Sequence, residues 1–394
     1  MTIAQGVSKQ AKMKEEVDWG VVPAAAGSKA LRRVTLDVSL KKDTYESKEI
    51  RTDAQVVDMR HGMRKVEGSL KSEVNPGDQA PFIAGILRRD FTAGKTTGAA
   101  SISVVADGYV RAAGSFITDG FQVGSVVRAV GLVNAANNGS NFFVTEVTAL
   151  KLKGLLINGD SLVVEAAAAG VVLTEPGKRT FVPKTGHTRK SWSMESWYSD
   201  VLESEVYTGL KATEASYNLP ATGMAEFEVK FLGKDVKTAK VEYFTNPIEA
   251  GTTAALAAVN GVVVFGGTRM TLATALQLNI NGNASTEAVI GSNSAPEIFS
   301  GRVTVSGTAS VFFQDGVERD KFLNETEAPV FCVFTSSSAK DADFVAITLP
   351  RVKYSSADKD DGEKGLIQTI AFTALRGIGV NQENTTIAVQ DTQA

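Results

Sequence analysis

The sequence has few of the residues on which most enzyme and metal chemistry depends. Its 394 residues include one cysteine, Cys332, and two histidines, His61 and His187. A single cysteine excludes an intramolecular disulfide and a cysteine-based zinc site, and two histidines leave little for imidazole catalysis or histidine-ligated metals. We therefore expect a protein that is not an enzyme, with no metal site and no cofactor.

An excess of charge and long hydrophobic runs are also missing. The chain has 41 Lys and Arg against 44 Asp and Glu, for a net charge of −3. No global positive field exists to hold nucleic acid or an anionic membrane. The most apolar stretches, around 155–173 and 254–266, are interrupted by charges or too short to cross about 30 Å of hydrocarbon. These features argue against a dedicated DNA-binding protein and against a membrane-spanning protein, and the N-terminal 20 residues are expected to form an exposed arm.

Strand patterns dominate what is present. Residues 224–232 alternate apolar and charged side chains, the period of two that places one face of a strand on a core and the other in solvent. Helical periodicity is scarce: residues 81–91, with Pro81 suited to a first turn, are the best helix candidate, and 194–201 are a weaker one. The pattern predicts a mainly β protein with short helices.

Residues 92–174 differ in amino-acid composition from the rest of the chain. Charges are sparse there, and short Val, Phe and Ile runs alternate with Asp-Gly and Asn-Gly turns. A Gly- and Thr-rich run at residues 93–98 begins the segment, and Glu175-Pro-Gly follows it, as in linkers. We expect an inserted small β-barrel or immunoglobulin-like module that projects outward and can be deleted by joining Phe91 to Glu175.

Short internal matches occur in one order on either side of this insertion. Residues 36–40 match 276–280, residues 62–69 match 301–308, and Ile50 lies opposite Val289-Ile. Downstream, Ala80-Pro matches Ala328-Pro, and Phe227 and Val229 are matched with Ile370 and Phe372. The order predicts two tandem copies of one β-sandwich or barrel domain, each with a flanking short helix: residues 1–91 with 175–245, and residues 246–394, with the insertion at 92–174.

Motifs that could carry chemistry are weak. Gly94-Lys-Thr lacks the first P-loop glycine, and residues 358–363 lack the spacing of a calcium loop and predict a solvated acidic hairpin tip. Cys332 lies in an apolar run that predicts a buried thiol. Trp192, Trp197 and Tyr198 could form a stacking platform, but such aromatics more often fill a core or a subunit interface.

Several motifs together resemble the major tail tube proteins of long, non-contractile-tailed (siphovirus-like) bacteriophages. In the first half they are residues 15–25 (EEVDWGVVPAA), 49–62 (EIRTDAQVVDMRHG), 66–69 (VEGS), 194–200 (MESWYSD), 206–211 (VYTGLK), 219–223 (LPATG) and 231–235 (FLGKD). In the second half they are residues 279–283 (NINGN), 290–294 (IGSNS) and 320–326 (DKFLNET). The insertion, through residues 113–128, is similar to the small β modules that decorate phage tail proteins.

The resemblance implies a structural virion protein, assembled in the host bacterial cytoplasm, whose rings stack into a hollow tail tube. Six tube domains per ring are expected of the family, so two domains per chain imply a trimeric ring with pseudo-sixfold symmetry rather than a hexamer. The implied partners are further copies of the chain, a tape-measure protein and transient double-stranded DNA in the lumen, and tail terminator and distal tail proteins at the ends.

The hairpin segments 41–60 and 281–300 are polar and rich in turns, so we expect them to be mobile in the free subunit and ordered between rings. The candidate assembly residues there are Arg51, Asp53, Arg60, Ser292 and Asn293. Two rival functions remain open: a tail-tip or adhesin-like module that binds host glycans through 92–174, and a glycan-degrading enzyme. Electron microscopy of the purified protein separates tubes from these alternatives.

Overall fold

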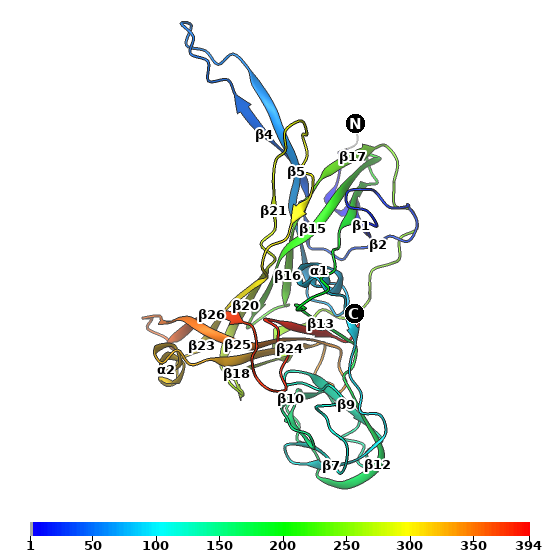
Figure 1. Cartoon of the computed structure of the whole chain (residues 1–394), viewed down its shortest axis with the longest axis vertical. Coiled ribbons are helices and arrows are strands. Elements are labelled where there is room, and N and C mark those ends of the chain that lie inside the picture. The colour runs from blue at the N-terminus through cyan, green and yellow to red at the C-terminus, as the bar shows by residue number, and fades with distance from the viewer. Residues whose placement is uncertain (1–2) are drawn as a thin grey trace.

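The computed structural model describes residues 3–394 and confirms the mainly β fold (Figure 1). Strands build most of the body, a long hairpin projects from one end, and a small closed barrel lies at the other. In the described part of the chain the α-helices are α1 (Ala80–Leu87) and α2 (Val317–Leu323). None of the helices described is long and apolar enough to cross a bilayer.

One continuous antiparallel sheet forms the centre of the molecule. Eight strands pair as neighbours in the order β4, β5, β16, β15, β20, β23, β26 and β25. Their bounds are β4 (Ser39–Glu46), β5 (Met59–Glu73), β15 (Glu203–Pro220), β16 (Glu226–Gly233), β20 (Ala273–Asn281), β23 (Thr304–Phe312), β25 (Phe344–Lys359) and β26 (Ile367–Leu375).

A second layer packs behind each half of this sheet. Behind the first half lie β1 (Lys9–Glu15), β14 (Trp192–Tyr198) and β17 (Asp235–Ala239), paired with each other through the first part of β15. Behind the second half lie β18 (Gly261–Phe265), β24 (Ala328–Thr335) and β27 (Ala388–Asp391), paired in the same way through the first part of β25. The same pairing order therefore occurs twice along the chain.

The registers of the two halves agree residue by residue. In the first half Phe231 pairs with Gly68 and, on its other side, with Ala212; in the second half Phe372 pairs with Gly307 and Tyr354. A bulge follows at Thr213 in β15 and at the matching Ser355 in β25. An added Cβ at Gly307 would lie 2.4 Å from the Phe372 ring, so the aromatic side chain requires glycine there.

These registers correct one of the sequence matches. Val229 and Phe231, rather than Phe227 and Val229, occupy the positions in the first half that Ile370 and Phe372 occupy in the second. A shift of two residues keeps the same face of a strand towards the core, so alternation alone does not distinguish the two alignments.

The helix predictions are partly right. Helix α1 begins one residue before the predicted segment 81–91 and ends within it, with Pro81 in its first turn and its C-cap Arg88 in the left-handed region. The weaker prediction at 194–201 is wrong, because β14 occupies it and pairs with both β1 and β15. The match of Ala80 with Ala328 is also wrong: Ala328 begins β24 and takes the place that Trp192 takes in β14.

The prediction of an exposed N-terminal arm is wrong as well. Residues 9–15 form β1, which pairs along its whole length with β14, and Ala11, Lys12 and Met13 are buried. Its charged residues predicted a disordered segment. Backbone hydrogen bonds and side-chain burial outweigh the conformational entropy that is lost when the segment is ordered.

The inserted segment contains a closed six-stranded barrel with its own core of sixteen buried residues. Its strands are β7 (Ala100–Val105), β8 (Gly108–Arg111), β9 (Val126–Val130), β10 (Phe142–Val147), β11 (Lys151–Leu156) and β12 (Glu165–Thr174). The remaining short elements are η1 (Gly6–Ser8), η2 (Ala258–Asn260), β2 (Lys29–Ala30), β3 (Thr35–Leu36), β6 (Thr92–Ala93), β13 (Lys178–Phe181), β19 (Thr268–Arg269), β21 (Ser285–Thr286) and β22 (Ile298–Phe299).

Candidate assembly surfaces

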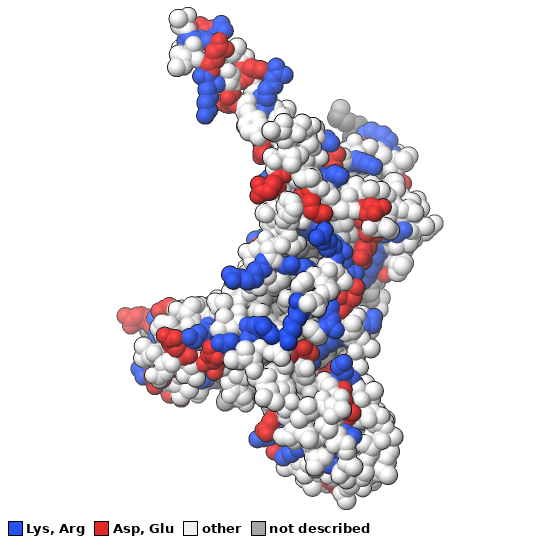
Figure 2. Space-filling model, in the orientation of Figure 1, with Lys and Arg blue, Asp and Glu red and all other residues white. Residues whose placement is uncertain are grey.

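The predicted contact residues of the first hairpin lie at its projecting end. Strands β4 and β5 extend beyond the body as a two-stranded ribbon, whose connection is residues 47–58 (Figure 1). Arg51 and Asp53 form an ion pair at 3.3 Å, and Arg60 pairs with Asp58 at 2.7 Å. All four side chains are substantially exposed, and Ile50 beside them is 99% exposed. An isolated subunit thus presents side chains of both charges (Figure 2) and an uncovered aliphatic side chain there.

Ser292 and Asn293 lie in the matching connection of the second half, between β20 and β23. The Asn293 carbonyl accepts a hydrogen bond from Arg64 N at 2.7 Å, so this loop leans against β5 of the first hairpin. The Ser292 hydroxyl closes a local turn with Ser294. The structure therefore places the five predicted residues at one end of the molecule, in two connections that occupy equivalent places in the two halves.

The central sheet ends in two unpaired strand edges. In the described part of the chain β4 pairs with β5 alone, and residues 353–359 of β25 pair with β26 alone. The matching edges inside the chain, those of β20 and β15, pair with each other over seven residues from Glu214 to Pro220. Free backbone donors and acceptors of this kind are a ready site for another strand.

One face of the central sheet is polar and divides into two regions. In the first half it carries charges in ion pairs, such as Lys71 with Glu228 at 3.7 Å and Lys230 with Glu214 at 3.1 Å. In the second half the same face is uncharged on β20, β23 and β26, whereas β25 at the sheet edge adds Lys353 and Asp358. The uncharged positions are, by register, Gln277, Asn279, Asn281, Thr304, Ser306, Thr308, Ser310, Thr369, Ala371 and Thr373. The opposite face supplies the apolar core, as the alternation of residues 224–232 predicted.

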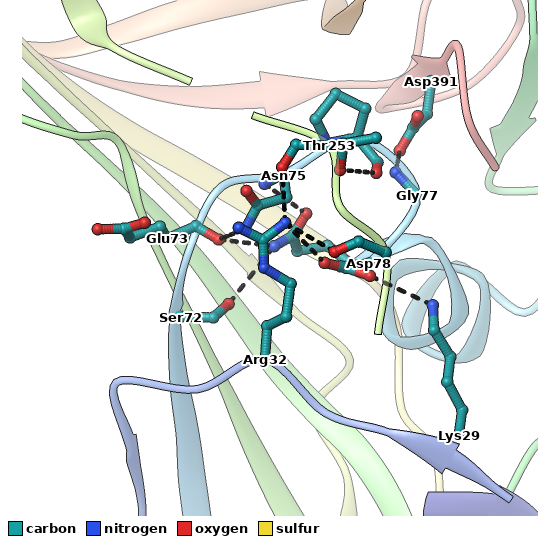
Figure 3. Close-up of polar contacts among 12 residues, drawn as sticks. Lys29, Arg32, Ser72, Glu73, Asn75, Gly77, Asp78, Thr253 and Asp391 are labelled. Carbon is teal, nitrogen blue, oxygen red and sulfur yellow. Dashed lines mark hydrogen bonds and ion pairs between the residues drawn. The ribbon is translucent and has the colours of Figure 1, made fainter. Parts of the chain in front are cut away.

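A polar joint holds the loop between β5 and α1 to distant segments (Figure 3). Arg32 donates to the Thr253 carbonyl at 2.7 Å and forms an ion pair with Asp78 at 3.6 Å. Asp391 accepts from Gly77 N at 2.8 Å. Burial raises the pKa of the Asp391 carboxyl to about 6, and the nearby Asp343 and Asp78 raise it further against the opposing effect of the N–H donors. The joint ties the C-terminal strand and the segment near 253 to the first half.

The outer faces of the two second layers have diverged in chemistry. In the first half Lys12 and Glu195 are paired across β1 and β14 and are both buried. Segment 242–244 covers them: Lys12 donates to the Phe244 carbonyl, and Glu195 accepts from Phe244 N at 2.8 Å. At the matching positions of the second half, paired across β18 and β24, stand Val264 and Phe331.

The barrel covers this apolar face. Val126, Phe143 and Ile157 of the barrel form one buried cluster with six residues of the second half: Val262, Val264, Phe331, Val333, Phe344 and Ala346. The Phe143 and Phe331 rings meet edge-on, with centroids 5.1 Å apart. Gln390 of β27 donates to the Val126 carbonyl at 3.0 Å and accepts from its N–H at 2.9 Å. The barrel is thus inserted in the first half of the sequence but packs on the second.

The aromatic residues, the cysteine and the acidic segment that the sequence singled out lie in structural rather than catalytic surroundings. Trp192 is buried against Phe82 in the main core, and Trp197 is also buried. Cys332 is buried, and burial raises the pKa of its thiol. Residues 360–366 connect β25 to β26 as an exposed acidic tip. The sequence did not identify which strands form the unpaired edges or which face the barrel docks on, because pairing between remote strands leaves no local sequence signal.

The geometry is that of a subunit with two like halves, free sheet edges and projecting hairpins, and comparison with known families agrees with it. A family model described as phage tail tube protein matches residues 6–374. No curated protein matches the chain. Since the match spans nearly the whole described fold, barrel included, the chain belongs to the phage tail tube protein family.

Proposed function

We propose that this protein forms closed rings that stack into the hollow tail tube of a siphovirus-like phage, through which linear double-stranded DNA passes into the host. Family membership supports a structural component of the virion tail. The observation that carries the ring is the pair of free edges on β4 and β25, which match the edges of β20 and β15 that already pair within the chain.

We infer three chains per ring. The chain has two tandem tube domains, residues 1–91 with 175–245 and residues 246–394, and the repeated pairing order supports this division. If the chain-to-chain junction copies the β15–β20 register, Ser356 faces Lys41 and Ala357 faces Leu40 of the next copy, as Glu214 faces Asn281 and Ala215 faces Ile280. A ring of three such chains has pseudo-sixfold symmetry.

The polar face of the central sheet would line the lumen. Its charges are balanced by ion pairs in the first half and are absent from β20, β23 and β26 in the second, so it offers DNA phosphates no continuous basic track. Such a lining suits transit rather than binding. The first occupant of the lumen would be an extended tape-measure protein, and the ends of the tube would meet terminator and distal tail proteins.

The hairpin connections at 47–58 and 282–303 project at one end of the subunit, where they would reach the adjacent ring. Arg51, Asp53, Arg60, Ser292 and Asn293 are the proposed polar contacts. The ion pairs of Arg51 with Asp53 and of Arg60 with Asp58 are exposed, so their exchange for contacts with another ring costs little.

The glycan-binding alternative has less support. The barrel holds Tyr109, Phe116, Phe121, Phe142 and Phe143 as its aromatic residues, and all five are buried. A sugar-stacking platform would need at least one exposed ring.

Electron microscopy of the purified protein tests the proposal. We expect rings or tubes with three barrel-sized protrusions per ring. Six equal protrusions would overturn the trimer, and a monomer that binds or cleaves glycans would overturn the tube.

A further inference from the structure

The junction between the two halves of the chain includes a second contact beside the paired strands. The turn between β15 and β16 meets the segment that leads into η2: Ala225 N donates to the Leu256 carbonyl at 2.9 Å, and Met224 forms a β-bridge with Ala257. Pro220, Val259, Gly261 and Phe334 line a cavity of about 390 Å³ there. Neither the turn nor this part of η2 carries a charge.

The matching elements lie at opposite, unpaired ends of the chain. η1 precedes β1 as η2 precedes β18, so Lys9 corresponds to Gly261 and Tyr198 corresponds to Phe334. Lys9 pairs with Tyr198 across β1 and β14, as Gly261 pairs with Phe334 across β18 and β24. The turn between β25 and β26, residues 360–366, corresponds to the turn between β15 and β16. When β25 of one copy pairs with β4 of the next, this tip must therefore approach η1 of the next copy.

The tip at 360–366 and the surface around η1 carry opposite charges, whereas the intrachain turn and η2 carry none. The tip and its flanks carry Asp358, Asp360, Asp361 and Glu363 against Lys359 and Lys364. Near η1, Arg33 donates to the carbonyls of Gly6 and Lys9, and the Lys9 ammonium lies 5.5 Å from the centre of the Tyr198 ring. In the described part of the chain neither Lys9 nor Arg33 forms an ion pair.

The immediate surroundings of these two cations favour an added anion. Burial and then the neighbouring Arg33 lower the pKa of Lys9, whereas Glu205 and Asp37 act in the opposite direction. Tyr207 donates to Glu205, and Asp37 accepts from Ser69 N, so both nearby acids already have hydrogen-bond partners. An incoming carboxylate would relieve the repulsion between Lys9 and Arg33.

We propose that the acidic tip at 358–363 docks on the Lys9 and Arg33 surface of the adjacent copy in the ring. This inference rests on the proposed ring function and names its partner, a second copy of this chain. The contact distinguishes the junction between chains from the junction within a chain, where the turn and η2 carry no charge and Arg269 is the charged residue that lines the adjoining cavity. The contact favours pairing between copies, because an acidic tip meets a basic surface only at the junctions between chains.

Charge reversal and its repair test the contact. The variant Asp361→Lys with Glu363→Lys changes exposed residues only, so folding should be unaffected. We expect its assembly into tubes at low salt, measured by sedimentation and electron microscopy, to require at least about tenfold more protein than wild type, since two charge pairs are inverted. The same chain with Lys9→Glu and Arg33→Glu added should regain assembly. The control Glu146→Lys reverses an exposed charge on the barrel and should have no effect.

The outcomes separate the inference from the ring proposal. If wild type forms no rings or tubes, the proposed function fails. If wild type assembles and the tip variant assembles equally well at low salt, the docking contact is wrong and the ring stands. If the four-residue combination stays monodisperse and folded by circular dichroism yet regains no assembly, the assignment of Lys9 and Arg33 as the partner surface is wrong.

Discussion

Two adjacent phenylalanines of the barrel allow its docking and its folding to be perturbed separately. Phe143 points out of the barrel into the cluster with Phe331, and Phe142 points into the barrel core against Tyr109, with ring centroids 4.8 Å apart. Both are almost fully buried. We expect Phe143→Ala to release the barrel from the second half while the barrel stays folded, and Phe142→Ala to unfold the barrel itself.

The expected size of the effect follows from what the Phe143 side chain touches. Truncation of a buried phenylalanine costs about 3–5 kcal/mol, of which the edge-on pair with Phe331 accounts for about 0.5–1.5 kcal/mol. A loss of that size lowers the docking equilibrium constant by roughly two to four orders of magnitude, at about 1.4 kcal/mol per factor of ten. The barrel then detaches for a measurable fraction of the time.

Hydrogen exchange measured by mass spectrometry reads both regions at once. In Phe143→Ala, amides of β24 and β18 should exchange faster while those of β10 and β11 stay protected; in Phe142→Ala the amides of β10 and β11 should also lose protection. Equal protection of β24 in Phe143→Ala and wild type would refute the idea that this face needs the barrel. The deletion that joins Phe91 to Glu175 should likewise require polar replacements at the six covered residues.

Three further predictions concern assembly and pH. Arg51→Glu or Asp53→Lys should weaken tube formation at low salt more than at high salt, measured by sedimentation; intact tubes at both salt concentrations would exclude these side chains as contacts. Amides of residues 47–58 should exchange rapidly in the free subunit and become protected in tubes, and slow exchange in both states would contradict an ordering role. The folded state raises the pKa of Asp391 to about 6, so it binds that proton more tightly than the unfolded chain, and the carboxyl's contribution to stability is present below about pH 4 and is lost as pH rises to about 6. The unfolding free energy of wild type minus that of Asp391→Asn should therefore fall by up to about 3 kcal/mol over this range in urea titrations, and a flat difference would contradict the burial argument.

The sequence predicted those features that local pattern determines. Alternation at residues 224–232 predicted which side chains of β16 reach the core, and Pro81 with its apolar neighbours predicted α1. The order of short matches predicted that β5 and β23 correspond, and the pairing registers agree. Each of these depends on residues within a few positions of one another.

Features that depend on pairing between distant segments could not be predicted from the sequence. The segment 194–201 has helical spacing by chance, and only its two strand neighbours, β1 and β15, make it a strand. The pattern of segment 9–15 predicts solvent exposure, because Glu195 and Phe244, which supply the polar partners that cover Lys12, lie far away in the sequence. The candidate contacts Arg51, Asp53 and Arg60 could be placed on a hairpin but not on its exposed end.

The substitution of Val264 and Phe331 for Lys12 and Glu195 makes the two halves mutually dependent. A first half expressed alone would leave the barrel with its docking side chains Val126, Phe143 and Ile157 in water, and a second half alone would expose the apolar strands that those side chains cover. Neither half can therefore be exchanged for a second copy of the other. The two halves are therefore held together as one unit, and in the proposed ring a barrel would cover every other tube domain.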